Sequence, residues 1–208
     1  LQADALGMLG NLHSLRGELG QAIQELQAAQ RLYEAVELRY WSQFNLATIA
    51  STYRRLGDYN KALEYNRQLL TEYEEAGDVL GAAAMRREIG FALEEKGLYA
   101  DALTQFKKAI SIYRDKGETI VADYTHLDTA RTLVRLERYE EALSDLARAR
   151  SRRNMDDTVN EALIRLTEGE ALVGLKRYDE GLAALDKAEP VFRQEDNTRR
   201  VSWVQEAR

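Results

Sequence analysis

The sequence predicts an all-α protein, built as a solenoid of antiparallel helix pairs. The first observation is an internal repeat: Tyr59, Tyr99 and Tyr139 stand 40 residues apart, and Leu19 and Tyr178 continue the series to within one residue. The second is that apolar residues recur at spacings of three and four, which is typical of amphipathic helices. The third is that the chain has one proline and few strand-like alternations. A regular period of about 20–50 residues indicates stacked structural units.

Small residues occupy two fixed positions in every repeat. One position lies three residues after the Tyr series and the other nine residues before it. Because small residues let two helices approach closely, each repeat is predicted to be a tightly packed helix pair. The two sets are Ala22, Ala62, Ala102, Ala142 and Gly181, and Gly10, Ala50, Gly90, Ala130 and Gly169.

Glycines divide the pattern into individual helices. Gly17, Gly57 and Gly97 fall within successive repeats, whereas Gly77 and Gly117 fall between repeats. Glycine readily adopts the left-handed conformation that ends a helix. The predicted helices are 2–16 with 20–37, 40–56 with 59–76, 79–96 with 99–116, 119–136 with 139–153, and 158–175 with 178–193.

These helices form five repeats at about 2–37, 40–76, 79–116, 119–153 and 158–193. A partial sixth repeat or capping helix follows at about 197–208. No linker or low-complexity stretch interrupts them, so we expect a single domain over 1–208. The chain begins at Leu1 within a helical pattern and ends in what reads as the opening of a helix. We therefore expect a fragment of a longer protein.

The third repeat carries the most complete signature, with Gly90, Leu93, Gly97, Tyr99, Ala102, Phe106 and Ala109 in register. This pattern resembles the tetratricopeptide repeat family, whose usual period is about 34 residues. The longer repeat is similar to the variant found in bacterial signalling and regulatory proteins. The resemblance implies a right-handed superhelix whose concave groove binds extended peptides or helices.

Composition argues against several other classes of function. The net charge is −6, which disfavours a general nucleic-acid binder. The absence of cysteine excludes thiolate catalysis and zinc–thiolate sites. No apolar run approaches the ~20 residues that cross a bilayer, so no membrane insertion by this segment is expected. We predict no catalytic residues, no cofactor and no metal, and the sequence leaves the compartment open.

The two histidines and a basic run are the candidate chemical sites in the sequence. His13 occupies the packing position of Tyr53 and Leu93, which indicates a structural role. His126 lies near Asp123 and Asp128, but these offer too few ligands for a metal. The basic run is either a favourable interaction with a helix C-terminus, helped by Asp156 and Asp157, or a phosphate or acidic-partner site. It comprises Arg148, Arg150, Arg152 and Arg153.

The face of each first helix opposite its small residues is the predicted partner-binding groove. Aromatic rings supply contact area and guanidinium groups bind carboxylates bidentately, so this composition suits a protein or peptide ligand. The alternative is that Phe91 and Tyr124 merely pack against each other. The predicted groove residues are Tyr40, Phe44, Arg54, Arg87, Phe91, Tyr124, Arg131 and Arg135.

The fifth repeat has an apolar face instead, with Leu163, Leu166 and Val173. Either a partner or residues beyond Arg208 would cover it. Because solenoids need polar caps, we expect exposed apolar surface and self-association through the C-terminal end.

The resulting hypothesis is a non-catalytic protein- or peptide-binding repeat domain. The leading context is the sensory or interaction region of a larger bacterial signalling protein, for example one with a GGDEF diguanylate cyclase output domain. The alternatives are a stand-alone adaptor or assembly scaffold, and the peptide-sensing region of a transcription regulator.

Overall fold

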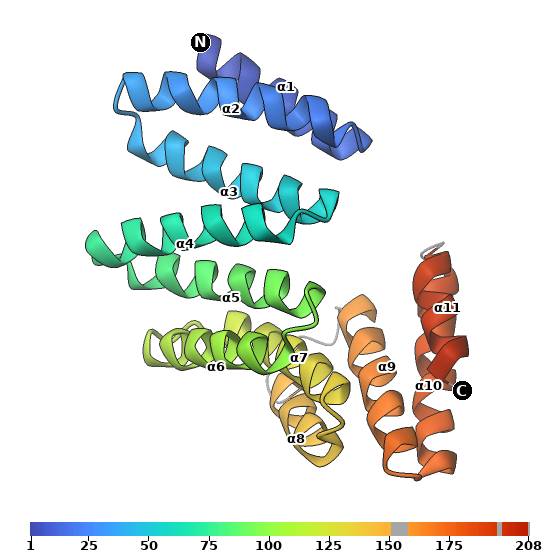
Figure 1. The fold of residues 1–208 in the computed structure, drawn as a ribbon. Helices are drawn as coiled ribbons and strands as arrows, with labels where there is room; N and C mark the ends of the chain where they lie inside the picture. The colour runs from blue at the N-terminus through green and yellow to red at the C-terminus, as the bar shows by residue number, and fades with distance from the viewer. Residues whose placement is uncertain (151–157, 195–196, 208) are drawn as a thin grey trace. The chain divides into compact units, whose positions relative to one another are not determined.

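The computed structural model describes residues 1–150, 158–194 and 197–207. Within these residues every regular element is an α-helix, which confirms the predicted all-α fold (Figure 1). The chain divides into two compact units, Leu1–Leu98 and Tyr99–Arg208. That the whole chain forms one continuous array stays a prediction.

Unit 1 holds five helices that follow one another through tight turns (Figure 1). Each helix packs against the next one in the chain, as the alternating apolar and polar faces predicted. The first and third helices also touch. The helices are α1 (Gln2–Arg16), α2 (Leu19–Ala35), α3 (Arg39–Leu56), α4 (Tyr59–Glu75) and α5 (Val79–Glu95).

The turns show why the sequence ends its helices where it does. Gly57 has a φ of 86° and ends α3 in the left-handed region, where its N–H bonds to the carbonyl oxygen of Arg54. The next residue, Asp58, caps the N-terminus of α4 and accepts a hydrogen bond from the backbone N–H of Lys61 at 3.1 Å. Glu137 stands at the corresponding glycine position of the fourth repeat and also has a positive φ, 58°. The left-handed turn is therefore kept there without glycine, at some cost in backbone strain.

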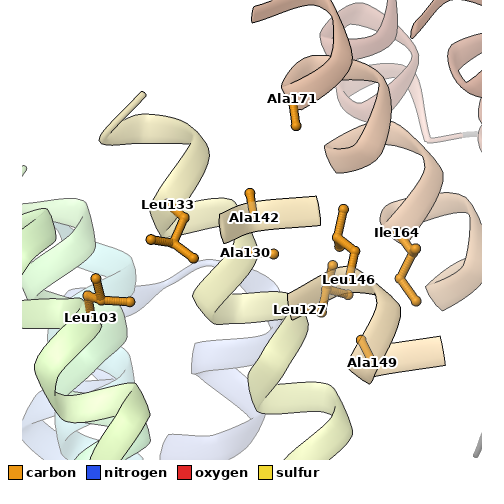
Figure 2. Packing of buried hydrophobic residues seen from close by; sticks show 9 residues of the cluster. All are labelled: Leu103, Leu127, Ala130, Leu133, Ala142, Leu146, Ala149, Ile164 and Ala171. Carbon is orange, nitrogen blue, oxygen red and sulfur yellow. The ribbon is translucent and has the colours of Figure 1, made fainter. Parts of the chain in front are cut away.

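Unit 2 begins with four helices around one hydrophobic cluster: α6 (Tyr99–Asp115), α7 (Thr119–Arg135), α8 (Tyr139–Arg150) and α9 (Thr158–Gly174). The final residues of the predicted helix 139–153 lie outside the described residues. Figure 2 shows side chains from all four helices meeting in this cluster. They are Leu103, Leu127, Ala130, Leu133, Ala142, Leu146, Ala149, Ile164 and Ala171.

The repeated small residues sit where paired helices come closest. A Cβ atom built on Gly169 would lie 2.6 Å from Cγ of Leu185 and 3.1 Å from the carbonyl oxygen of Gly181. A Cβ on Gly10 would lie 2.6 Å from Cγ of Leu26. Real Cβ atoms do not approach so closely, so glycine is what permits this helix separation.

The end of unit 2 corrects one expectation. Helices α10 (Tyr178–Gln194) and α11 (Thr198–Ala207) pack with α9 around a second cluster that includes Leu166, 4% exposed, and Val204, fully buried. Val173 points toward α10, since its Cγ2 would lie 2.8 Å from a Cβ on Gly181. The predicted open apolar face is therefore covered, because α10 and α11 supply apolar residues within this chain. Self-association stays a prediction.

Candidate functional site

The predicted groove residues fall into one set in each unit. Unit 1 contains Tyr40, Phe44, Arg54, Arg87 and Phe91, on α3 and α5. Unit 2 contains Tyr124, Arg131 and Arg135, all on α7.

The first two turns of α3 expose three adjoining aromatic rings, which we name the aromatic cluster: Tyr40, Trp41 and Phe44. Their exposed fractions are 72%, 47% and 53%. Trp41 stands edge-on to both neighbours, with ring centroids 5.4 Å from Tyr40 and 6.4 Å from Phe44. Trp41 is not among the predicted groove residues because it lies one position off the predicted face. Grouped exposed aromatic rings of this kind mark interaction surfaces.

The ring of Phe91 contacts two arginines from different helices. The Cζ atom of Arg87, one turn before Phe91 on α5, lies 5.0 Å from the Phe91 ring centroid. The Cζ atom of Arg54, from α3, lies 5.8 Å from the same centroid. Each contact is a cation–π interaction worth about 0.5–1 kcal/mol at an exposed site. The ring thus holds two positive charges close together.

Arg54 is only partly satisfied by the protein. Its Nη1 donates to Oε1 of Glu95 at 2.9 Å. Its Nε atom is buried and has no hydrogen-bond partner among the residues that the structure describes. The neighbouring Arg55 is engaged differently, since its Nη1 donates to the carbonyl oxygen and to Oγ of Ser14, at 2.6 and 2.7 Å. Arg55 therefore ties α3 to α1, whereas Arg54 belongs to the candidate binding surface.

In unit 2, Tyr124 is half-buried, and Arg131 and Arg135 are exposed. Arg131 forms a long ion pair with Asp128, at 3.9 Å. Both arginines act electrostatically on Glu170 of α9: burial raises the pKa of this carboxyl, and the positive charges of Arg135 and Arg131 oppose the rise. This set has arginine and carboxylate groups together, but no exposed aromatic cluster.

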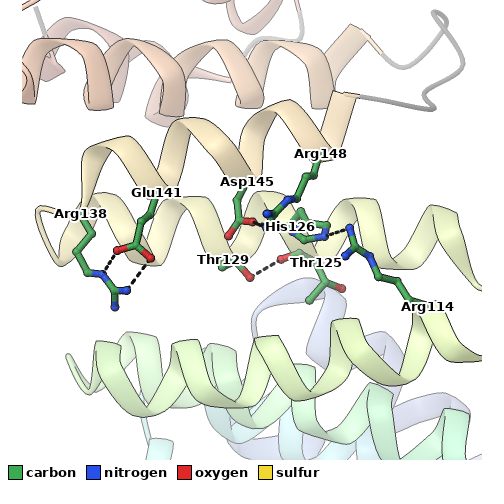
Figure 3. Close-up of polar contacts among 8 residues, drawn as sticks. All are labelled: Arg114, Thr125, His126, Thr129, Arg138, Glu141, Asp145 and Arg148. Carbon is green, nitrogen blue, oxygen red and sulfur yellow. Dashed lines mark hydrogen bonds and ion pairs between the residues drawn. The ribbon is translucent and has the colours of Figure 1, made fainter.

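His126 lies at the centre of a polar network that the sequence analysis missed (Figure 3). Nη2 of Arg114 lies 2.8 Å from Nε2 of His126. Because a guanidinium only donates, Nε2 must accept, and the imidazole is neutral with its proton on Nδ1. Nδ1 then donates to Oδ1 of Asp145 at 3.1 Å, and Arg148 donates to the same oxygen at 2.9 Å.

The network corrects the predicted surroundings of His126. Asp123 and Asp128 are close to His126 in the sequence, but the bonded carboxylate is Asp145, from the next helix. Proximity in the sequence does not identify this partner, because the packing of α8 on α7 is what brings Asp145 to His126. His126 and Asp145 are 2% and 6% exposed, so the pair is part of the interior.

A pocket of about 500 Å³ opens above this pair, between α6, α7 and α8. Lys107, Ser111 and Arg114 line it from α6, and Ser144 and Arg148 line it from α8. No local sequence motif predicts the pocket, because the residues that line it come from three helices.

The remaining chemical candidates have structural partners. Nδ1 of His13 lies 2.9 Å from Oε1 of Gln21, across the turn between α1 and α2. Arg150 donates twice to Glu168 of α9, both times at 2.9 Å, and so links α8 to α9. Arg152 and Arg153, like Asp156 and Asp157, lie outside the described residues.

The described parts of the chain offer neither a metal site nor a membrane span. No group of three or more His, Asp or Glu side chains is placed to hold a metal ion. Among the same residues, no helix has both the length and the apolar character needed to span a membrane.

Sequence models of the tetratricopeptide repeat match residues 42–115 and 127–196, which together make up more than half of the chain. The chain belongs to the tetratricopeptide repeat family. This confirms the resemblance drawn from the repeat signature; assignment to the long-repeat variant stays a prediction. No curated protein sequence matches the chain.

Solved structures share the tetratricopeptide fold at low sequence identity. The apo form of RapI is 16% identical with a TM-score of 0.83, over 98% of this chain and 75% of RapI. BtubC from P. vanneervenii is 14% identical with a TM-score of 0.78, over 93% and 80% of the two chains. NprR in complex with its cognate peptide NprX is 15% identical with a TM-score of 0.69, over 98% of this chain and 60% of NprR. At these identities the likeness shows the fold alone.

Proposed function

We propose that this tetratricopeptide repeat protein binds an acidic peptide or protein segment, without catalysis of its own. The binding surface is the aromatic–arginine face of unit 1, defined as Tyr40, Phe44, Arg54, Arg87 and Phe91. The observation that carries the proposal is Phe91, which holds the guanidinium groups of Arg54 and Arg87 within 6 Å of its ring. The exposed aromatic cluster lies on one of the same two helices.

The chemistry of this face favours a carboxylate-bearing ligand. A guanidinium offers a planar fork of donors that matches a carboxylate, and the Phe91 ring orients two such groups. Glu95 already holds Arg54 and so stands where a ligand carboxylate would bind. A ligand that displaces Glu95 gains a charge-assisted contact and returns Glu95 to water. Tyr40 and Phe44 add apolar contact at little cost in side-chain entropy.

The structure of NprR with its peptide NprX supports a peptide as the ligand class, because that protein shares the fold. Within the proposal, Tyr124, Arg131 and Arg135 of unit 2 provide further ligand contacts. We also propose that the repeats form the sensory or interaction region of a larger bacterial signalling protein, for example one with a GGDEF domain. An adaptor and a peptide-sensing transcription regulator remain the alternatives, and sequencing the flanking reading frame decides among them.

The ligand class is tested by selecting binders from a random-peptide display library and measuring their dissociation constants by fluorescence anisotropy. We expect the selected peptides to be enriched in Asp or Glu beside apolar residues. Selected peptides without acidic residues would contradict the proposed chemistry.

The location of the site is tested with charge-matched variants. Arg87→Gln is expected to weaken binding roughly tenfold, the usual loss for one charge-assisted contact. Arg67→Gln, exposed on α4 and outside the face, removes the same charge and should change affinity by less than about twofold. Glu95→Gln should strengthen binding by releasing Arg54. Equal losses for Arg87→Gln and Arg67→Gln would refute this location.

A further inference from the structure

We propose that the pocket between α6, α7 and α8 is a binding site for a phosphomonoester group. The inference concerns unit 2 alone and does not depend on the proposed peptide-binding function. It rests on three features of the pocket: side-chain donors of α6 that the protein leaves unused, carboxylates whose negative charge is largely compensated, and a volume larger than a bare ion requires.

The unused donors lie along one stripe of α6. Lys107, Ser111 and Arg114 are spaced by four and then three residues, which places them on one face of the helix, and all three are exposed. Lys107 and Ser111 make no hydrogen bond or ion pair with other described residues, and Arg114 makes only its bond to His126. The other N–H groups of Arg114 therefore remain available to a ligand.

The acidic groups at the pocket are mostly occupied. Asp145 accepts hydrogen bonds from His126 and Arg148, at 3.1 and 2.9 Å. Glu141 is held by two hydrogen bonds from Arg138, at 2.6 and 2.7 Å (Figure 3). Of the carboxylates that line the pocket, Asp115 alone lacks such a partner among the described residues. The carboxylates that line the pocket therefore offset little of the positive charge of Lys107 and Arg114.

The neutral His126 fixes the geometry of this wall. Its Nε2 accepts from Arg114, so one end of that guanidinium is anchored to a side chain that is 2% exposed. An anchored guanidinium loses less side-chain entropy when it binds a ligand than a freely rotating one. His126 is therefore a positioning residue for Arg114.

The donor set selects the chemical class of ligand. A phosphomonoester carries three terminal acceptor oxygens and a charge of about −1.5 to −2 at neutral pH. It can accept from Lys107, Ser111 and Arg114 together, whereas a carboxylate has two oxygens and a single charge. The pocket volume of about 500 Å³ far exceeds the roughly 30 Å³ share of one water molecule. It leaves room for part of the molecule that bears the phosphate.

The site can be observed directly because the chain has only two histidines. The imidazole signals of His126 and His13 are followed by NMR while sodium phosphate, O-phospho-L-serine or sodium acetate is added at constant pH and ionic strength. We expect phosphate and phosphoserine to shift the His126 signals saturably, without moving those of His13. Unmoved His126 signals, or an equal response to acetate, would overturn the proposal.

Neighbouring lysines provide a matched pair of variants. Lys107→Gln is expected to weaken phosphate binding roughly tenfold. Lys108→Gln removes the same charge from the same helix outside the pocket, and should alter affinity by no more than about twofold. Both side chains are exposed, so neither variant should disturb the fold. Equal losses would assign the response to general electrostatic attraction and refute the site.

A final comparison identifies the source of the phosphomonoester. A phosphoserine-containing peptide that binds more tightly than O-phospho-L-serine indicates a phosphorylated protein segment. Equal affinity indicates a small phosphorylated molecule. A peptide that binds equally well with unmodified serine would contradict the proposed ligand class.

Discussion

Gly169→Ala is expected to destabilise the protein by about 1 kcal/mol, although alanine forms helices better than glycine. The new Cβ would lie 2.6 Å from Cγ and 2.7 Å from Cδ2 of Leu185, and 3.1 Å from the carbonyl oxygen of Gly181. Leu185 is fully buried, so it has little space to move aside. Overpacking of this kind costs about 1–3 kcal/mol. The gain in helix propensity offsets about 1 kcal/mol of that cost.

Gly20→Ala is the control, because it makes the same chemical change where no atom would contact the new Cβ within 4 Å. Gly20 lies in the first turn of α2, so its stabilisation should be at most about 1 kcal/mol. The assay is urea unfolding of both variants and of the unmodified chain, followed by far-ultraviolet circular dichroism. If Gly169→Ala raised the unfolding midpoint as much as Gly20→Ala does, the argument from close helix packing would be refuted.

Three further predictions concern buried or paired polar groups. Arg150 lowers the pKa of Glu168 below 4.5 by hydrogen bonding. The pair's contribution to stability is present above pH 4.5 and is lost as the pH falls through the lowered pKa. In acid unfolding, Arg150→Gln should therefore lose less stability on acidification than the unmodified protein does. Burial raises the pKa of Glu170 above 4.5, which costs stability as the pH rises from 4.5 through the raised pKa; Glu170→Gln should therefore raise the melting temperature at pH 7 but not at pH 3. The buried Asn45 side chain donates to two acceptors at 2.8 and 2.9 Å, so Asn45→Ala should cost about 1–3 kcal/mol in urea unfolding, while the exposed Asn60→Ala should cost less than about 0.5 kcal/mol. A loss of the same size in both asparagine variants would contradict the role given to burial.

Local signals in the sequence predicted the helices well. Helices are predicted at 40–56 and 59–76, and the structure has them at Arg39–Leu56 and Tyr59–Glu75. The reason is that Gly57 and Asp58 determine the turn through their own backbone and side-chain chemistry. A helix end depends on a few adjacent residues, so it can be read without knowing the partners in space.

Contacts between helices were predicted less well. The aromatic and arginine residues of α3 and α5 were assigned to one face, but the stacking of Arg54 and Arg87 on Phe91 depends on the separation and offset of the two helices. The partner of His126 was missed for the same reason, since Asp145 reaches it only through the packing of α8 on α7. The sequence predicted either a partial sixth repeat or a capping helix at about 197–208, but not that Val204 of this helix packs in one cluster with Leu166, because that contact depends on how α11 packs on α9.

The repeat signature itself cannot specify a ligand, because its residues are used in packing. Leu185 and the small residues of each pair are enclosed between helices and unavailable to a partner. The candidate binding residues lie instead at positions that differ between repeats. Phe91 stands where the second repeat has Ser51 and the fourth has Arg131, and His126 corresponds to Arg86 in the repeat before it. Residues that depart from the repeat are therefore those most informative about function, and both proposed sites are built from them.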